Sequence, residues 1–259
     1  VVLSYLKTTY DKTEKEPDVT IEGLVKDTDY SVTYSNNVNA GTATVTIVGM
    51  NDYVGTLYQH FTIEPAKMTG VSVHGYKGTY DESIHTITLD GVPEGAVVTY
   101  ASEESGIYSE MKPDRRSAGT TTVYYKIKKA NYEELKGCVK IVIEAAPIAE
   151  KKVELSDVSY VYDGTAKSPN VAIAGMIRGI DFTVIYSKNV DAGTGIVTVE
   201  GIGNYKGVLY QYFTIEPAEL TGISAQGYTG EYDKKSHTII LQGVPEGAVV
   251  TYATVKEGI

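Results

Sequence analysis

Residues 208–217 read Val-Leu-Tyr-Gln-Tyr-Phe-Thr-Ile-Glu-Pro, and this stretch decides the fold class. Leu209, Phe213 and Ile215 fall on one face of an extended chain, because successive side chains of a strand point to opposite faces. The closing proline has no N–H group, so it ends ladder pairing. The stretch therefore predicts a half-buried β-strand that stops at a boundary.

The same period of two recurs in residues 182–186, and turn-forming Gly and Asn gather in segments such as residues 201–204. The composition of 22 Tyr, 26 Gly and no Trp also favours strands and turns. Alternating apolar faces need a second sheet to cover them. We therefore expect an all-β protein made of small antiparallel β-sandwich modules of the immunoglobulin-like type. A β-grasp-like half-open sheet is the second choice.

The chain repeats itself over a long period. Residues 153–259 match residues 1–107 at a constant offset of 152 without a gap, and 59 of the 107 positions are identical. Residues 91–100 recur unchanged as residues 243–252. Each long period contains two related units with the same short motifs in the same order. These motifs are Tyr-Asp, Val-x-Tyr, Ala-Gly-Thr and a final Asn-Tyr or Asp-Tyr.

These motifs predict a tandem array of modules. We name them A1 (residues 1–66), B1 (67–147), A2 (148–218) and B2 (219–259). Pro65, Pro147 and Pro217 lie at the boundaries, which predicts short and fairly stiff linkers. B2 repeats only the first half of B1, so half of its apolar pattern lacks a partner sheet. We expect B2 to be poorly ordered on its own.

Charge and composition exclude several classes of partner. The sequence has 33 Asp and Glu against 23 Lys and Arg, a net charge of −10, which disfavours nucleic acid and anionic membrane surfaces. It has no apolar run long enough for membrane insertion and no N-terminal signal pattern, as expected of an excised piece. Cys138 is the only cysteine, so neither an intrachain disulfide nor a cysteine-based metal site can form.

Few residue patterns point to catalysis or to a cofactor. His85 and His237 occupy equivalent positions in Tyr-Asp-x-x-x-His, and we interpret them as structural, since no histidine pair has the spacing of a metal site. The acidic residues are dispersed, so we predict no metal site, although a calcium ion at a junction stays open. The sequence has no Gly-x-Ser-x-Gly motif and no dinucleotide fingerprint. We therefore predict no catalytic residue, no cofactor and no enzymatic activity.

Tyrosine is the one unusual resource of this sequence. Tyrosines recur in the Tyr-Asp motif (Tyr10, Tyr80, Tyr162, Tyr232) and in the Val-x-Tyr motif (Tyr34, Tyr100, Tyr186, Tyr252). We interpret them as half-buried rings whose hydroxyl groups bond the backbone, with a ligand platform as the alternative. Positions that differ between copies, such as residues 5–9 against residues 157–161, are better candidates for a copy-specific contact. The sequence singles out no binding residue.

Four segments together resemble a known kind of module. They are residues 162–167 (Tyr-Asp-Gly-Thr-Ala-Lys), residues 29–37, the Ala-Gly-Thr strand start and residues 204–207 (Asn-Tyr-Lys-Gly). In this order they are similar to the YDG or MBG-type repeat modules of large Gram-positive surface proteins, which occur in gut Firmicutes adhesins. The resemblance covers the whole chain and implies extracellular display at the cell surface, with no particular ligand. A1 departs from the pattern, because Lys12 stands where A2 has Gly164.

The repeats and the resemblance together predict a function. We expect a non-enzymatic bacterial cell-surface repeat array that acts as spacer and adhesion or interaction surface. One alternative is a dedicated binder of host immunoglobulin or mucin, and a second is a set of accessory modules of a secreted polysaccharide-active enzyme. Expected partners are the neighbouring modules of the same chain and a host glycoprotein or immunoglobulin. A glycan is the weaker candidate, because no Trp is present for stacking.

Overall fold

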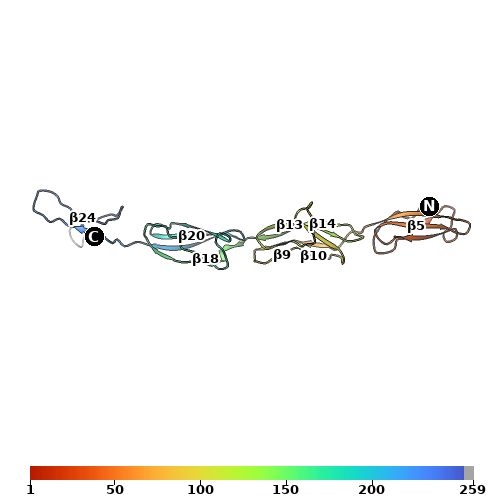
Figure 1. Cartoon of the computed structure of the whole chain (residues 1–259), viewed down its shortest axis with the longest axis horizontal. Helices are drawn as coiled ribbons and strands as arrows, with labels where there is room; N and C mark the ends of the chain where they lie inside the picture. Colours follow the sequence, from red (N-terminus) through yellow and green to blue (C-terminus); the bar gives the residue numbers. More distant parts are fainter. Residues whose placement is uncertain (254–259) are drawn as a thin grey trace. The chain divides into compact units, whose positions relative to one another are not determined.

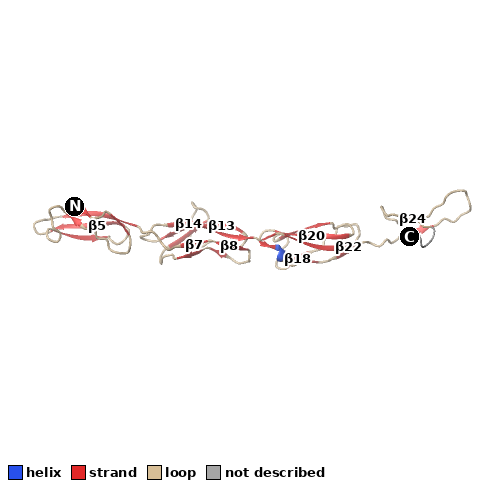
Figure 2. Ribbon diagram, turned by 180° about the vertical axis from the view of Figure 1, so that it is seen from behind, coloured by secondary structure: helices blue, strands red, loops and turns tan. Residues whose placement is uncertain are grey.

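The structure is a computed structural model that describes residues 1–253. Its regular elements are strands, apart from one short 3₁₀ helix, η1 (Ile148–Glu150), among the described residues (Figures 1 and 2). The expected all-β fold class is therefore confirmed. Residues 254–259, the last of B2, lie outside the described residues.

Module A1 is a small two-layer sandwich. Its strands are β1 (Val2–Leu3), β2 (Lys7–Thr9), β3 (Val19–Thr20), β4 (Tyr30–Ser35), β5 (Gly41–Gly49) and β6 (Thr56–Glu64). One sheet has the order β2-β6-β5-β4, and the other is the pair β1-β3. Val19 of β3 joins the buried cluster that includes Val45 of β5 and Phe61 of β6. The alternation read from the sequence thus places one apolar face of β5 and β6 in the core.

Module B1 has the same kind of main sheet with two short pairs beside it. Its strands are β7 (Ser72–His74), β8 (Tyr76–Thr79), β9 (His85–Thr86), β10 (Thr88–Asp90), β11 (Val97–Ala101), β12 (Asp114–Arg115), β13 (Gly119–Lys128) and β14 (Leu135–Glu144). The sheet order is β11-β13-β14-β8, and the pairs are β7-β10 and β9-β12. Ile87, Val123 and Ile141 are fully buried in its core. Cys138 on β14 is exposed, on the opposite face from Ile141.

Module A2 repeats the strands of A1. They are β16 (Val153–Leu155), β17 (Ser159–Val161), β18 (Val171–Ile173), β19 (Phe182–Ser187), β20 (Gly193–Gly201) and β22 (Val208–Glu216). The main sheet has the order β17-β22-β20-β19, and β16 pairs with β18. Phe213 and Ile215 are buried and Leu209 is half-buried on one face of β22, as the opening stretch predicts. Glu216 ends the strand directly before Pro217.

One pairing differs from the antiparallel sheet that we expected. The first strand of each main sheet pairs in parallel with the last strand, as in β2 with β6, β8 with β14 and β17 with β22. All other pairs within these sheets for which a register is given are antiparallel. Strands joined by a tight turn must run in opposite directions, but β2 and β6 are separated by most of the module. Their long connection lets the chain return in the same direction.

The turn after the Tyr-Asp motif is the same in all four modules. Lys12 has a φ of 74°, and Gly164, the aligned residue of A2, has a φ of 78°. The corresponding residues of B1 and B2, Glu82 and Lys234, have φ values of 66° and 61°. The departure of A1 from the Tyr-Asp-Gly pattern therefore leaves its turn intact, with a lysine in the left-handed region that favours glycine.

Contact patterns divide the chain into two compact units. The first contains residues 1–149 with residues 180–182 and 201–207, and the second contains the rest. In B2, the described residues form the pair β23 (Ser224–Gln226) with β24 (Ile240–Gln242). The side chains that form the core of B1 are open to solvent there: Tyr252 is 65% exposed, whereas Tyr100 is 6% exposed. Among the described residues, B2 has no counterpart of β13 or β14 that would cover these side chains.

Candidate functional site

The histidines of the Tyr-Asp motif are part of a turn. The His85 Nε2 atom lies 2.9 Å from Asp81 Oδ1, and the imidazole stacks on the Tyr76 ring with 3.8 Å between centroids. The hydrogen bond from His85 lowers the pKa of Asp81. B2 has the same arrangement, in which the residues are His237, Asp233 and Tyr228. The contacts on both sides of each imidazole support the structural interpretation.

A lysine closes the same turn in the A modules. Asp163 accepts hydrogen bonds from the Thr165 N–H and hydroxyl groups and forms an ion pair with Lys167. The Lys167 side chain is only 10% exposed, and its hydrogen bond to the Asp163 carboxylate is the main reason that the pKa of Asp163 is lowered. A1 repeats the contacts with Asp11, Thr13 and Lys15. The Tyr-Asp-x-Thr-x-Lys segment is thus a built turn whose polar groups satisfy one another.

The Val-x-Tyr tyrosines of the A modules are anchored to the backbone. The Tyr34 hydroxyl donates to the Pro17 carbonyl oxygen at 2.6 Å, and the Tyr186 hydroxyl donates to the Pro169 oxygen at 2.6 Å. Both rings are half-buried. For these two tyrosines, the geometry is the one that the structural interpretation predicts, and it leaves no free hydroxyl for a ligand.

Two kinds of site can be checked across residues 1–253. In this range, no group of three or more His, Cys, Asp and Glu side chains is placed to hold a metal ion. No helix in the same range is long and apolar enough to cross a bilayer. The arrangement that does recur, and that gathers the sequence motifs, lies where A1 meets B1.

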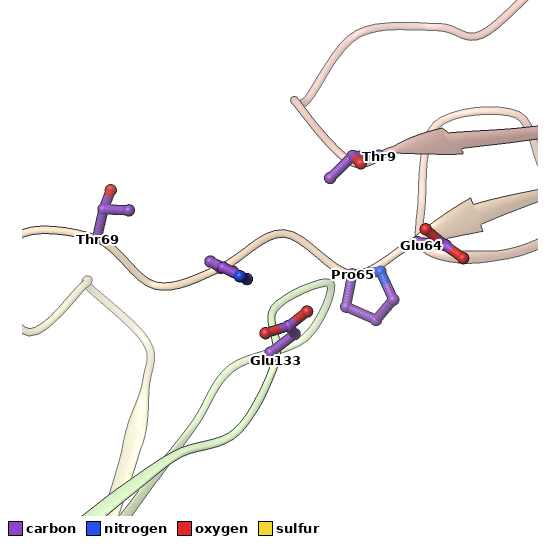
Figure 3. A pocket seen from close by; sticks show the side chains of 6 residues that line it. Thr9, Glu64, Pro65, Thr69 and Glu133 are labelled. Atoms are coloured by element: carbon purple, nitrogen blue, oxygen red, sulfur yellow. The ribbon is translucent and has the colours of Figure 1, made fainter.

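The junction between A1 and B1 is formed by the turn between β13 and β14. Figure 3 shows this turn, in pale green with Glu133 labelled, beside Pro65. The Asn131 carbonyl oxygen accepts from the Ala66 N–H at 3.0 Å, and the Glu133 N–H donates to the Ala66 oxygen at 2.9 Å. Ala66 and Tyr132 thereby form a parallel β-bridge. The residue after the boundary proline is therefore bound on both its polar backbone groups.

The Asn131 side chain adds two more hydrogen bonds. Its Oδ1 atom accepts from the Ala40 N–H at 2.9 Å, and its Nδ2 atom donates to Asn39 Oδ1 at 2.8 Å. Ala40 is the alanine of Ala-Gly-Thr, so this motif presents a backbone donor to the next module. An amide side chain fits this place because it accepts and donates at once.

Two tyrosine rings complete the junction. Tyr10 of the Tyr-Asp motif and Tyr132 meet edge to face, with 5.6 Å between centroids and 79° between planes. Such pairs are a favoured aromatic geometry. Three residues of a module together form what we call its acceptor site. They are the tyrosine of Tyr-Asp, the alanine of Ala-Gly-Thr and the alanine after the last strand. In A1 these residues are Tyr10, Ala40 and Ala66. We call the residues that fill it the Asn-Tyr turn.

The same contacts occur a second time within the first unit. Asn204 Oδ1 accepts from the Ala118 N–H at 2.8 Å, and the Asn204 oxygen accepts from the Ala146 N–H at 2.9 Å. Tyr80 and Tyr205 meet edge to face at 5.6 Å and 83°. Strand β15 (Ala146–Pro147) pairs in parallel with β21 (Tyr205–Lys206). An acceptor site of Tyr80, Ala118 and Ala146 is thus filled by the Asn204-Tyr205 turn.

Burial separates a docked turn from a free one. Tyr205 is 6% exposed, and burial raises the pKa of its hydroxyl. Tyr53, the aligned residue of A1, is 44% exposed. A depression of about 750 Å³ beside the A1–B1 junction is lined by Thr9, Glu64, Pro65, Lys67, Thr69 and Glu133. It is an open flank of the junction and contains no buried polar group aimed at a ligand.

The sequence identifies the motifs but does not predict that they contact one another across a junction. Sequence reasoning assigned the junctions to prolines alone and interpreted the tyrosines one by one. The signal was the repetition of Tyr-Asp, Ala-Gly-Thr and Asn-Tyr in a fixed order, since motifs that recur together in every module are candidates for contact with one another. Only the structure shows that the partners belong to adjacent modules.

A second surface distinguishes A2 from A1. On the outer face of its main sheet, Ile185 is 58% exposed, Tyr210 is 56% exposed and Tyr212 is 58% exposed. The aligned residues of A1 at two of these positions are Thr33 and His60. Exposed tyrosine and aliphatic groups on one sheet face are typical of contact surfaces. At two of its three exposed positions, this face therefore differs between the two copies.

Comparison with known proteins gives no family. No protein-family model matches the chain, and no curated protein does. Among solved structures, protocadherin gammaB7 EC3-6 is 9% identical with a TM-score of 0.27, and covers 84% of this chain and 76% of its own. Protocadherin gammaB3 EC1-4 is 10% identical with a TM-score of 0.22, and the match covers 74% of this chain and 65% of that one. Drosophila N-cadherin EC1-4 is 12% identical with a TM-score of 0.22, and the match covers 87% of this chain and 78% of that one. Identities and TM-scores this low give no basis for assigning the function of these proteins to this chain.

Proposed function

We propose that this chain is part of a non-enzymatic bacterial cell-surface repeat array whose modules act as a spacer and an interaction surface. The observation that carries the proposal is the Asn-Tyr turn, which makes the same hydrogen bonds and ring contact with its acceptor site twice. The resemblance to YDG or MBG-type modules supports display outside the cell.

A spacer keeps its ends apart only if its junctions resist bending. A proline fixes one backbone torsion, but the remaining torsions of a linker stay free. At the A1–B1 junction, the hydrogen bonds of Ala66 and Ala40 attach two separate points of A1 to one turn of B1. Directional bonds at separate points oppose both bending and rotation. The junction therefore supports a spacer better than a hinge.

Distance measurement between two spin labels tests the spacer. One label uses the native Cys138, which is exposed in B1, and the other uses Thr62→Cys, an exposed position of A1. We expect one narrow distance distribution in this chain. The double substitution Asn131→Ala with Tyr132→Ala should broaden it, because it removes the side-chain bonds and the ring pair. An equally broad distribution before and after the substitution would contradict the spacer.

A dedicated binder of a host glycoprotein or immunoglobulin is the second candidate function. The exposed face of Ile185, Tyr210 and Tyr212 on A2 favours it, because A1 lacks two of these three residues. The chain provides its own control: Ile185→Thr with Tyr212→His gives A2 the residues of A1. Titration against polyclonal immunoglobulin or mucin should then show weaker binding. Binding that is unchanged would exclude this face, and no binding by the parent chain would exclude the candidate.

A further inference from the structure

The end of A2 has a third acceptor site that no Asn-Tyr turn of the described residues fills. Its members are Tyr162, Ala192 and Ala218, which align with Tyr10, Ala40 and Ala66 of A1. We propose that this surface is a docking site for the Asn-Tyr turn of another module of the same type, and that it selects Asn over Asp. The proposal deepens the array function proposed above and rests on it.

Exposure distinguishes this site from the two filled ones. All three members are half-buried in A1 and in B1, whereas all three are exposed in A2. Tyr162 is 39% exposed, although its Tyr-Asp turn is built like that of A1. A depression of about 560 Å³ lies here, lined in part by Tyr162, Asp191, Ala192 and Ala218. The surface that the turn covers elsewhere is therefore open in A2.

The unfilled site is already shaped for its occupant. The Tyr162 N–H donates to the Glu216 carbonyl oxygen at 2.9 Å, as the Tyr10 N–H donates to the Glu64 oxygen at 2.9 Å. These bonds fix the tyrosine beside the end of the last strand. A site that keeps its shape without a ligand loses little conformational freedom on binding. The geometry thus favours the same turn that binds the other two sites.

The occupant should carry Asn at its tip. In A1, Asn39 accepts a hydrogen bond from Asn131 Nδ2, and the residue of A2 at this position is Asp191. A carboxylate accepts from an amide N–H group and strengthens the bond by its charge. It repels a second carboxylate at the same distance. The Asp52-Tyr53 turn of A1 is therefore a poor occupant, which disfavours head-to-tail pairing of two copies of this chain.

The repeat identifies where such a turn belongs. B2 follows A2 and repeats B1 at an offset of 152, so the counterpart of Asn131 falls at position 283 (131 plus 152), after the 259 residues of this sequence. In the described part of B2, the strands that would carry this turn are absent. A completed B-type module is the occupant that matches both the order of the modules and the chemistry of Asp191.

Appending residues 108–147 of B1 after Ile259 completes B2 and tests the proposal. We expect the exchange rate of the Ala192 amide hydrogen to fall at least tenfold in the extended chain, because this N–H then donates to an Asn side chain. Asn131→Ala in the appended copy should abolish the protection. Asn131→Asp should also reduce it, and adding Asp191→Asn should restore it. An Ala192 amide that exchanges equally fast in all these chains, while the appended strand amides are protected, would overturn the proposal.

A second variant applies if the appended strands stay unprotected. Asp52→Asn gives the parent chain an Asn-Tyr turn of its own, so at millimolar concentration one copy should slow the exchange of Ala192 in another. Adding Tyr162→Ala should remove the effect. Unchanged exchange at every concentration would overturn the proposal. A narrow spin-label distance across A1 and B1 would leave the array function standing in that case, so the two failures are distinguishable.

Discussion

The substitution Asn131→Ala tests the A1–B1 junction through the exchange rate of one amide hydrogen, that of Ala40. The Ala40 N–H is half-buried and donates to Asn131 Oδ1 at 2.9 Å, so its exchange with solvent requires the junction to open. The substitution removes this bond and the bond from Asn131 Nδ2 to Asn39. Two such bonds, each with a net value of about 1 kcal/mol, make opening easier by about 2 kcal/mol.

This free energy converts directly into an exchange rate. A change of about 2 kcal/mol corresponds to about a 30-fold change in the opening equilibrium. We therefore expect the Ala40 amide to exchange about 30 times faster in the variant, as measured by hydrogen–deuterium exchange with residue resolution. Core amides such as that of Val45, which is fully buried in β5, should keep their rates, because the fold of A1 is unchanged.

The matched control is Asn204→Ala, which removes the equivalent bond to Ala118. This substitution should increase the exchange rate of the Ala118 amide hydrogen and leave the exchange rate of the Ala40 amide hydrogen unchanged. If neither amide responds to its own substitution, the side-chain bonds contribute nothing to the junctions. If each substitution accelerates both amides, the effect is a general loss of stability, and the local account is refuted.

Four more substitutions test the modules themselves. Lys12→Gly should stabilise A1 by up to about 1 kcal/mol in denaturant unfolding, because glycine adopts a positive φ without the strain that a residue with a Cβ atom has there. A loss of stability would show that the contacts of the lysine side chain outweigh this strain. Gly195→Ala should destabilise A2 by about 1–3 kcal/mol, since its methyl group would lie 2.3 Å from a Phe213 ring atom, and an unchanged midpoint would mean that the ring moves freely. Phe61→Ala should cost A1 about 3–5 kcal/mol while the near-ultraviolet signal of the other modules persists, and concerted unfolding of all modules would contradict independent cores. Because the pKa of Asp163 is lowered in the folded state, its carboxylate stabilises the fold at pH values above the ordinary pKa of Asp, and this stabilisation is lost as the pH falls through the pKa of the folded state. Asp163→Asn should therefore flatten the acid limb of a profile of stability against pH. An identical profile for the variant would mean that the ion pair does not contribute to stability.

The local pattern of the sequence was enough to predict the strands. The alternation around Phe213 predicts a half-buried strand because burial on one face imposes a period of two on any sheet. The parallel pairing of β2 with β6 was beyond such reasoning, since 46 residues lie between Thr9 and Thr56 and local pattern does not fix the direction of a distant partner. Lys12 departs from the Tyr-Asp-Gly pattern, yet its φ is close to that of Gly164.

The candidate site was predictable only in part. The sequence identifies Tyr10, Ala40 and Asn131 as members of repeated motifs, but a motif by itself does not state whether its partner lies in the same module or in the next one. The hydrogen bond from the Ala40 N–H is a backbone contact, so no side chain at position 40 announces it. Tyr34 was easier, because a half-buried tyrosine beside a strand commonly bonds a nearby carbonyl group.

The parallel pairing of the first and last strands determines how a module meets tension. In A1, Lys7, Thr8 and Thr9 lie opposite Thr62, Ile63 and Glu64, so the chain enters the module at one end of this ladder and leaves it at the other. A pull on the two ends drags β2 and β6 past each other along their common direction. All hydrogen bonds of the ladder then share the load in shear, whereas a hairpin pulled from its open end breaks them one after another. A chain built in this way is suited to carry mechanical force.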